Sequence, residues 1–134
     1  EYCGLQHAHM AFLVIAHAPA DFDRWLEAQR QPAKTPPDET AARGREVFLN
    51  GSCVLCHSVR GTIARSAFGP DLTHLASRRT LASGTTPNTR GHLAGWILDP
   101  QVIKPGTRMP ANHLDHHDLH ALLAQTDVVA LAEE

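Results

Sequence analysis

Cys53-Val54-Leu55-Cys56-His57 is the stretch that decides how this chain folds and what it binds. Two cysteines three positions apart, followed at once by a histidine, form the attachment motif of c-type haem. Each thiol can add across a vinyl group of haem to give a thioether, and His57 can then bind the iron from the proximal side. A zinc site would need a second pair of ligands at similar spacing, and a redox-active dithiol is the remaining alternative. Because no second Cys-x-x-Cys or compact Cys/His pair follows, the motif predicts a covalently bound haem c.

A haem iron that only transfers electrons needs a sixth ligand, and methionine is the usual one because it raises the reduction potential. The chain has two methionines, Met10 and Met109. Met109 follows Lys104-Pro105-Gly106 and precedes Pro110, so it lies in a loop that prolines stiffen and a glycine allows to turn. This setting favours an iron ligand over a core-filling side chain. With both axial positions filled, the iron has no open site for oxygen or peroxide, which favours an electron carrier over a haem enzyme.

The size and composition of the chain fit a small haem domain. Its 134 residues allow one ordinary domain and an appendage, and aromatic residues make up only 5 %. Because a small domain buries a modest fraction of its surface, a haem would form a large part of the core. The net charge of −2 gives no support for binding nucleic acid or an anionic membrane surface. No apolar run is long enough to span a bilayer, and no secretion signal opens the sequence.

The pattern of apolar residues and prolines predicts two units joined by a linker. In the first unit, residues 10–17 are apolar and β-branched and predict a strand, and a helix opens at Pro19 and ends before Pro32. Residues 32–39 hold three prolines and no apolar periodicity, and predict the linker. The second unit is predicted to be helical and rich in loops, with little room for a sheet. Its expected helices are 40–50 with Thr40 as cap, a short turn over 70–77, 90–98 and 115–131.

Residues 40–131 resemble class I c-type cytochrome domains, with Gly44 and Phe48 before the haem motif, Gly69-Pro70 after it and a loop methionine near the end. One departure is Gln125, where the last helix of such domains often carries an aromatic side chain. Longer stretches are similar to the cytochrome domain fused to subunit II of certain bacterial cytochrome c oxidases: Gly69-Pro70-Asp71-Leu72-Thr73-His74-Leu75, Asn88-Thr89, Trp96-Ile97-x-Asp99-Pro100-Gln101 and Lys104-Pro105-Gly106-x-x-Met109-Pro110.

The resemblance implies a mainly α fold. A mono-haem class I cytochrome c domain would occupy residues 40–134. The strand and helix before it, within residues 1–31, would be the C-terminal remnant of a cupredoxin-like copper-A domain.

The first ten residues resemble the end of the binuclear copper-A motif of oxidase subunit II: Glu1-Tyr2-Cys3-Gly4-Leu5-x-His7-x-x-Met10. Soft sulfur and imidazole ligands suit copper. The resemblance implies that Cys3 bridges two coppers, that His7 and Met10 are terminal ligands, and that the Glu1 carbonyl is a weak ligand. The other cysteine and the first histidine of that motif would lie upstream of Glu1. We therefore expect this chain to be a fragment of a longer subunit and to hold no working copper site by itself.

Several further side chains are candidates for the surroundings of the haem. Pro70 is expected to pack against the proximal imidazole, with a nearby backbone carbonyl accepting the other ring N–H. Arg78 is a candidate partner for a haem propionate, with a solvated charge as the alternative. Trp96 is expected to wall the pocket or to donate its indole N–H to a propionate. Four histidines around the last helix are interpreted as a solvated face, with an adventitious metal clamp as the alternative: His113, His116, His117 and His120.

The resemblance implies that this chain relays electrons and is not catalytic by itself. Haem c would take an electron from an external donor and pass it to the copper-A centre of the full-length subunit, on the periplasmic face of a bacterial inner membrane. The expected partners are oxidase subunit I, the rest of subunit II, and as donor a soluble or membrane-bound cytochrome or a quinol–cytochrome c reductase. The alternatives are a free-standing c-type cytochrome and a peroxidase-like haem enzyme, which would need an open iron site.

Overall fold

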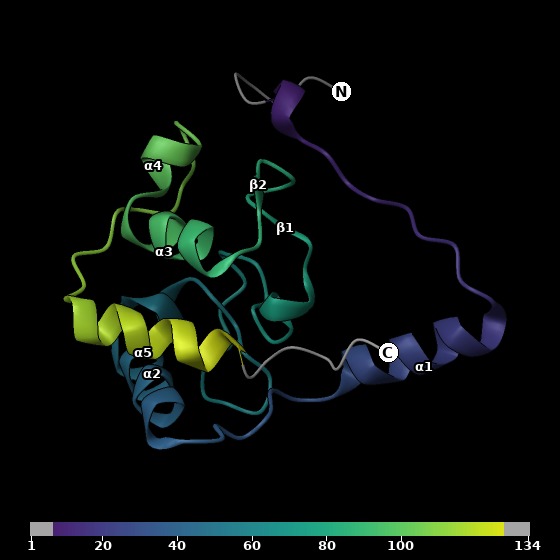
Figure 1. The fold of residues 1–134 in the computed structure, drawn as a ribbon, viewed down its shortest axis with the longest axis horizontal. Helices are drawn as coiled ribbons and strands as arrows, with labels where there is room; N and C mark the ends of the chain where they lie inside the picture. The colour runs from purple at the N-terminus through teal and green to yellow at the C-terminus, as the bar shows by residue number, and fades with distance from the viewer. Residues whose placement is uncertain (1–6, 128–134) are drawn as a thin grey trace.

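The computed structural model describes residues 7–127, and these residues are mainly helical (Figure 1). Their only sheet is one antiparallel pair of two-residue strands, so the predicted mainly α fold is confirmed. No helix of the described chain combines the length and the apolar character that a bilayer span requires. The elements in chain order are the 3-10 helix η1 (His7–His9), α1 (Pro19–Arg30), α2 (Glu39–Asn50), the 3-10 helices η2 (Ser52–Leu55) and η3 (Leu75–Ser77), β1 (Thr80–Leu81), β2 (Thr86–Pro87), α3 (Arg90–Leu98), α4 (Pro100–Ile103) and α5 (His116–Asp127).

Helices α2 and α5 lie side by side and form the scaffold of the domain (Figure 1). A Cβ atom on Gly44 would lie 2.0 Å from the carbonyl oxygen of Ala121, so only a glycine allows the two backbones to come this close. An ion pair of 2.7 Å between Arg43 and Asp118 links the same two helices. The hydrogen bond and the charge of Asp118 raise the pKa of Arg43 above its ordinary value.

The apolar core is built from short contributions of several elements. Leu75 of η3, Leu81 of β1, Leu93 of α3 and Leu123 of α5 form one buried cluster, and Trp96 packs partly buried against it. In the described residues the buried hydrophobic side chains are five leucines and three alanines. The core therefore contains no buried aromatic ring, and it is small for a domain of this length.

The structure confirms α1 and α3 as predicted and corrects the boundaries of other helices. Helix α2 is capped by Asp38, whose carboxylate accepts a hydrogen bond of 2.8 Å from the Ala41 N–H, whereas the predicted cap Thr40 lies inside the helix. A carboxylate also favours the positive end of the helix dipole, which gives Asp38 the advantage. Of the turn predicted over 70–77, only the last three residues are helical. Helix α5 begins at His116, and its predicted extension beyond residue 127 lies outside the described residues.

The predicted strand over residues 10–17 is wrong. This segment is irregular and exposed, with Phe12 88 % and Val14 85 % accessible. A strand needs a neighbouring strand for its N–H and C=O groups, and within the described chain no strand lies beside this segment. One backbone hydrogen bond of 3.0 Å, from Ala11 N–H to the Ser83 carbonyl, connects it to the turn between β1 and β2.

Helix α1 lies apart from the other helices (Figure 1), but its C-terminal end contacts the domain. The carbonyl oxygen of Gln29 accepts hydrogen bonds from the guanidinium of Arg60 and from the imidazole Nε2 of His74, the latter at 3.2 Å. The Ala33 N–H donates to the Arg60 carbonyl at 3.0 Å. The proline-rich connection therefore lies against the domain at its end nearest to α1.

Candidate haem-binding site

The two cysteines and the histidine of the haem motif lie in one tight turn directly after α2. Cys53 is in η2, and its carbonyl accepts hydrogen bonds from the N–H groups of Cys56 at 3.1 Å and of His57 at 2.9 Å. Both cysteines are free thiols; Cys53 is half-buried and Cys56 is exposed. The turn thus brings the three side chains that the motif singled out onto one short segment.

Burial raises the pKa of the Cys53 thiol above its ordinary value; a backbone hydrogen bond opposes this effect, and the nearby Cys56 adds to it least. Cysteines that act as nucleophiles or redox catalysts have a lowered pKa, because the thiolate is the reactive form. Burial of Cys53 thus acts in the opposite direction to the lowered pKa of a redox-active thiol.

The imidazole of His57 is held by the backbone of residues 69 and 70. Its Nδ1–H donates a hydrogen bond of 2.9 Å to the carbonyl oxygen of Pro70. The lone pair of the neutral ring is therefore on Nε2. A Cβ atom on Gly69 would lie 2.7 Å from Cε1 and 2.8 Å from Nδ1 of the ring. The Gly69 N–H also donates to the Cys56 carbonyl at 2.6 Å. Segment 69–70 therefore packs directly on the ring and fixes its tautomer.

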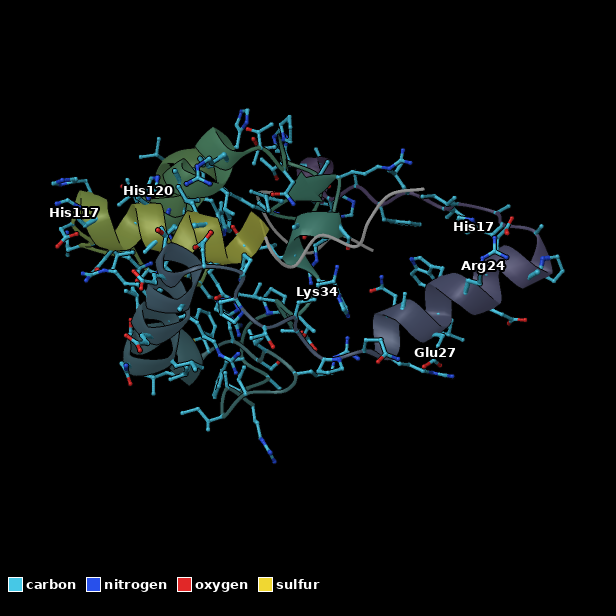
Figure 2. The ribbon with its side chains drawn as sticks, turned by 60° about the horizontal axis from the view of Figure 1, so that its bottom comes forward. His17, Arg24, Glu27, Lys34, His117 and His120 are labelled. Carbon is cyan, nitrogen blue, oxygen red and sulfur yellow. The ribbon has the colours of Figure 1, made fainter. Side chains whose placement is uncertain are left out.

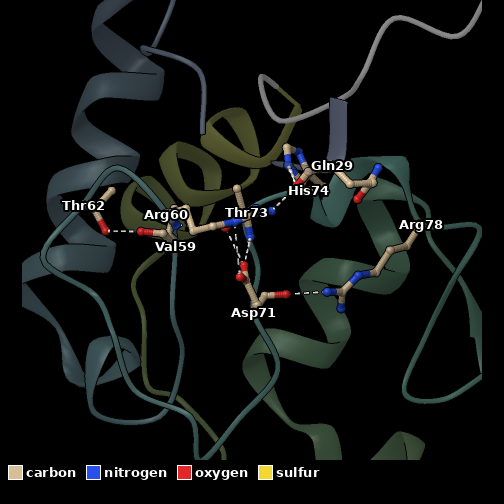
Figure 3. A network of polar contacts seen from close by, with 8 residues as sticks. All are labelled: Gln29, Val59, Arg60, Thr62, Asp71, Thr73, His74 and Arg78. Carbon is tan, nitrogen blue, oxygen red and sulfur yellow. Dashed lines mark hydrogen bonds and ion pairs between the residues drawn. The ribbon is translucent and has the colours of Figure 1, made fainter. Parts of the chain in front are cut away.

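A polar network around Asp71 holds the chain immediately after Pro70 (Figure 3). The Asp71 carboxylate accepts hydrogen bonds from the Thr73 N–H, at 2.7 Å, and from the Thr73 hydroxyl. The Arg60 N–H donates to the same hydroxyl oxygen at 2.9 Å, and its guanidinium lies 3.6 Å from the carboxylate. Arg78 donates to the Asp71 carbonyl.

The same network sets the charge state of Asp71. Burial acts to raise the pKa of its carboxyl, but the two hydrogen bonds from Thr73 and the charges of Arg60 and Arg78 outweigh burial and lower it. The roles of Asp71 and Arg60 were not predicted from the sequence, although Asp-x-Thr is a pattern typical of turns in which the aspartate bonds to the backbone two residues on. Arg78, the predicted propionate partner, is exposed and bonded to the backbone of this network.

Met109 lies half-buried in the loop between α4 and α5. Gly106 gives this loop its turn, with a φ of +85°. The side chain of Gln101, from α4, donates hydrogen bonds to the carbonyl oxygens of Thr107 at 2.7 Å and of Met109 at 3.1 Å. The loop that carries the predicted distal ligand is thus tied to a helix. Gln101 lies in a stretch that resembles the oxidase cytochrome domain, but its hydrogen bonds to the Met109 loop were not predicted from the sequence.

Large apolar side chains are exposed on the domain that carries the haem motif. Five large apolar side chains in residues 55–102 are exposed, with Phe68 90 %, Val102 79 % and Ile63 76 % accessible. The hydroxyl of Ser66 donates to the Leu55 carbonyl at 2.8 Å, which brings the Phe68 segment next to the haem motif. Water penalises exposed apolar area by about 25 cal/mol per Å². Two thiols, an imidazole and uncovered apolar side chains are the kinds of group that a haem c site requires. The five residues are Leu55, Ile63, Phe68, Leu98 and Val102.

The predicted copper ligands are only partly described. Glu1 and Cys3 lie outside the described residues. His7 begins η1, and the Met10 N–H donates to the His7 carbonyl at 3.1 Å. Within residues 7–127, no three His, Cys, Asp or Glu side chains lie close enough together to hold a metal ion.

The four histidines around α5 are all exposed, as a solvated face requires. His117 and His120 project from α5 at the end of the molecule away from α1 (Figure 2). They line an open depression together with Glu39, Arg43 and Asp115. The backbone N–H of Asp118 donates to the Asp115 carboxylate at 2.8 Å and lowers the pKa of that carboxyl.

Comparison with known proteins points to the same chemistry. A family model described as cytochrome c matches residues 41–124. Subunit 2 of cytochrome c oxidase from Alkalihalophilus pseudofirmus is 38 % identical over 125 residues, which are 92 % of this chain and 36 % of the relative. The subunits 2 of Bacillus sp. strain PS3 and Bacillus subtilis are 31 % and 29 % identical, over 91 % and 84 % of this chain and 35 % and 32 % of the relatives.

These matches define how far the similarity reaches. The chain spans about a third of the length of the curated relatives that it matches. The matches of 115 to 127 residues extend well beyond the 41–124 range of the family model, so they include part of the segment before the domain. The resemblance to oxidase subunit II that the sequence motifs indicated is confirmed.

Proposed function

Because the chain belongs to the cytochrome c family, we propose that it carries one covalently bound haem c and transfers electrons in a cytochrome c oxidase. The observation that carries this proposal is the setting of His57. Its ring follows two free cysteines at the attachment spacing, and its Nδ1–H is bonded to the Pro70 carbonyl, which leaves the Nε2 lone pair available for iron. Cys53 and Cys56 would hold the haem through thioethers, and His57 and Met109 would be its axial ligands.

The bound haem would supply a reversible one-electron couple, and the chain's own residues set the conditions for it. The Pro70 carbonyl orients the imidazole by accepting a hydrogen bond from its Nδ1–H, which makes Nε2 a stronger electron donor to a metal. Gly69 allows the backbone to approach the ring. The exposed apolar side chains on the same domain would exclude water from a haem that they cover, and solvent exclusion is one of the factors that set its reduction potential.

Covalent attachment is the first test of this proposal. The chain, produced in a bacterium that matures c-type cytochromes, should keep a haem after denaturing electrophoresis and show peroxidase staining at its own mass. Replacing both Cys53 and Cys56 by serine should abolish the stain, because both thioethers are lost. A wild-type chain without stain in a host that matures a control cytochrome c would contradict the proposal.

The finer proposal concerns the route of the electron. In the full-length subunit, the haem domain would receive an electron from an external cytochrome or reductase and pass it to a copper-A centre on the periplasmic side of the membrane. Cys3, His7, Met10 and the Glu1 carbonyl would contribute to that centre, and subunit I would reduce oxygen. The similarity that extends beyond residues 41–124 supports this arrangement over a free-standing carrier.

The route can be tested in the assembled oxidase. After rapid mixing with a reduced donor cytochrome, electrons that pass through the haem domain should reduce copper-A, and its absorption should decrease. A full-length subunit with Met109→Ala should slow this bleaching at least about tenfold, because removal of the thioether lowers the haem potential. Unchanged bleaching in the variant would show that electrons reach the copper centre without passing through this domain.

A further inference from the structure

The side chain of Gln101 binds three residues of the Met109 loop at once. Its Nε2 donates to the carbonyl oxygens of Thr107 at 2.7 Å and Met109 at 3.1 Å, and its Oε1 accepts from the Gly106 N–H at 3.0 Å. A side-chain amide has two N–H donors and one oxygen acceptor. Gln101 thus uses both kinds of group on the backbone of a single loop.

Gln101 is itself fixed, so it can serve as an anchor for that loop. It lies in the one-turn helix α4, and its own N–H donates to the Asp99 carboxylate at 3.0 Å. Pro100, immediately before it, is fully buried. The Lys104 N–H closes the helix by donating to the Pro100 carbonyl at 2.8 Å. The amide group of Gln101 is therefore presented from a rigid base.

The far side of the loop is held by a second amide. Asn112 donates through Nδ2 to the carbonyl oxygens of Ile97 at 2.9 Å and Pro110 at 3.2 Å, and its N–H donates to the Leu98 carbonyl at 2.9 Å. Met109 therefore lies between two anchors. Only the Gln101 anchor includes the Met109 carbonyl itself.

We propose that Gln101 is a positioning residue for the distal iron ligand: its amide holds the backbone of residues 106–109 so that Met109 stays within reach of the haem iron. The inference rests on the proposed function, because it takes Met109 as that ligand. Fixing the backbone of a loop residue costs conformational entropy. Because the Gln101 hydrogen bonds order the loop before the ligand binds, the weak bond between iron and thioether does not have to offset this loss of entropy.

The experiment uses the haem-loaded full chain and compares Gln101→Ala and Gln101→Glu with wild type. Glutamate keeps the acceptor for Gly106 but places a carboxylate oxygen against the carbonyls of Thr107 and Met109. Arg108→Ala is the matched control, because Arg108 lies in the same loop, is exposed, and makes no side-chain hydrogen bond within the described residues.

In the wild type and in Arg108→Ala, the oxidised chain should show the weak far-red band of a thioether bound to iron, and the reduced chain should bind carbon monoxide slowly. In both Gln101 variants, carbon monoxide should bind about tenfold faster or more, the fold-change expected for the loss of one to two hydrogen bonds. The far-red band should also disappear at a lower temperature than the helical circular dichroism. A purely structural role would instead lower both melting temperatures together and leave carbon monoxide binding unchanged.

The outcomes separate this inference from the function on which it rests. If the wild type shows the band and both Gln101 variants match it in band and in carbon monoxide binding, the positioning role is wrong and the ligation by Met109 stands. If the wild type lacks the band, Met109 is not the ligand and both claims fail. If Gln101→Ala does not fold, Gln101→Glu decides alone, since it preserves the size of the side chain.

Discussion

The imidazole of His57 is oriented by main-chain atoms more than by side chains. The Pro70 carbonyl accepts a hydrogen bond from its Nδ1–H, and the backbone of Gly69 lies directly against the ring. The Asp71 network then holds the residue that follows. Each contact narrows the orientations of the ring, and a ring fixed before it meets the iron binds with less loss of entropy.

Replacing Gly69 by alanine should displace the His57 ring, because the new Cβ would lie 2.7 Å from Cε1 and 3.1 Å from the Cys56 carbonyl oxygen. We expect a loss of about 1–3 kcal/mol in the free energy of unfolding, as for other overpacked sites. Urea unfolding of the haem-loaded chain measures this loss. Gly91→Ala is the control, since no atom lies within 4 Å of a Cβ there. Equal stability of the two variants would contradict the packing of Gly69 on the ring.

Asp71→Asn should destabilise the domain at neutral pH by about 0.5–1 kcal/mol, a value that allows for solvent screening of a half-exposed carboxylate. The pKa of Asp71 is lowered on folding, so its charge stabilises the domain above its ordinary pKa. This contribution is lost as pH falls through the lower, folded pKa. The difference between variant and wild type should therefore be constant near neutral pH and should begin to shrink only as pH falls below about 4, the ordinary pKa of an aspartate. A constant difference in urea unfolding across pH 7 to 3 would show that shape, not charge, matters at this position.

The residues of the haem motif could be predicted because covalent attachment requires a fixed spacing. The roles of Asp71 and Gln101 could not, since both act on backbone atoms of residues that become their neighbours only in the folded loop. Both residues lie in stretches that resemble the oxidase cytochrome domain, but these stretches do not indicate which groups the two side chains bind.

At the scale of elements, the crossing of α2 and α5 is the contact on which the domain is built. Gly44 and the carbonyl of Ala121 meet there, and Arg43 and Asp118 pair across the same interface. The interface also contains a cavity and an unsatisfied polar atom. An apolar cavity of about 50 Å³ lies between α2, α5 and the loops below them. Gln125, which lines it, has a buried amide oxygen that lacks a hydrogen-bond partner, at the position where related domains often carry an aromatic.

Gly44→Ala should separate the two helices, because its Cβ would lie 2.0 Å from the Ala121 carbonyl oxygen, a rigid backbone atom. We expect a loss of about 2–3 kcal/mol in the free energy of unfolding. Gly95→Ala on α3 is the matched control, since its Cβ would make only an ordinary contact of 3.6 Å with Ile103. Thermal unfolding followed by circular dichroism measures both. If Gly44→Ala melts with Gly95→Ala, the helices do not depend on this close approach.

Helices were predicted more accurately than the strand because a helix satisfies its hydrogen bonds within itself, whereas a strand depends on a partner. The ranges of α1 and α3 follow from prolines and apolar spacing. The cap of α2 was assigned to Thr40 where the stronger acceptor Asp38 lay two residues earlier. Residues 10–17 have the composition of a strand, yet composition supplies no neighbour to pair with.

At the scale of the whole molecule, a helical domain with few buried apolar side chains is preceded by an exposed segment and helix. Residues 10–17 and α1 expose large apolar side chains, among them Phe12, Val14 and Trp25. The contacts of Gln29 and Ala33 with Arg60 connect this appendage to the loop that precedes Asp71. These contacts limit how far the domain can turn relative to the segment before it.

The central claim is that this chain holds a haem c whose two axial positions are both filled, by His57 and Met109. The most direct measurement is the far-red absorption of the oxidised haem-loaded chain, recorded together with carbon monoxide binding to its reduced form, in wild type and Met109→Ala. In the wild type we expect a thioether-to-iron band and slow carbon monoxide binding. In the variant, the haem should stay attached, the band should disappear and carbon monoxide should bind rapidly. A wild type that lacks the band and binds carbon monoxide as fast as the variant would contradict the claim and favour an open, peroxidase-like iron.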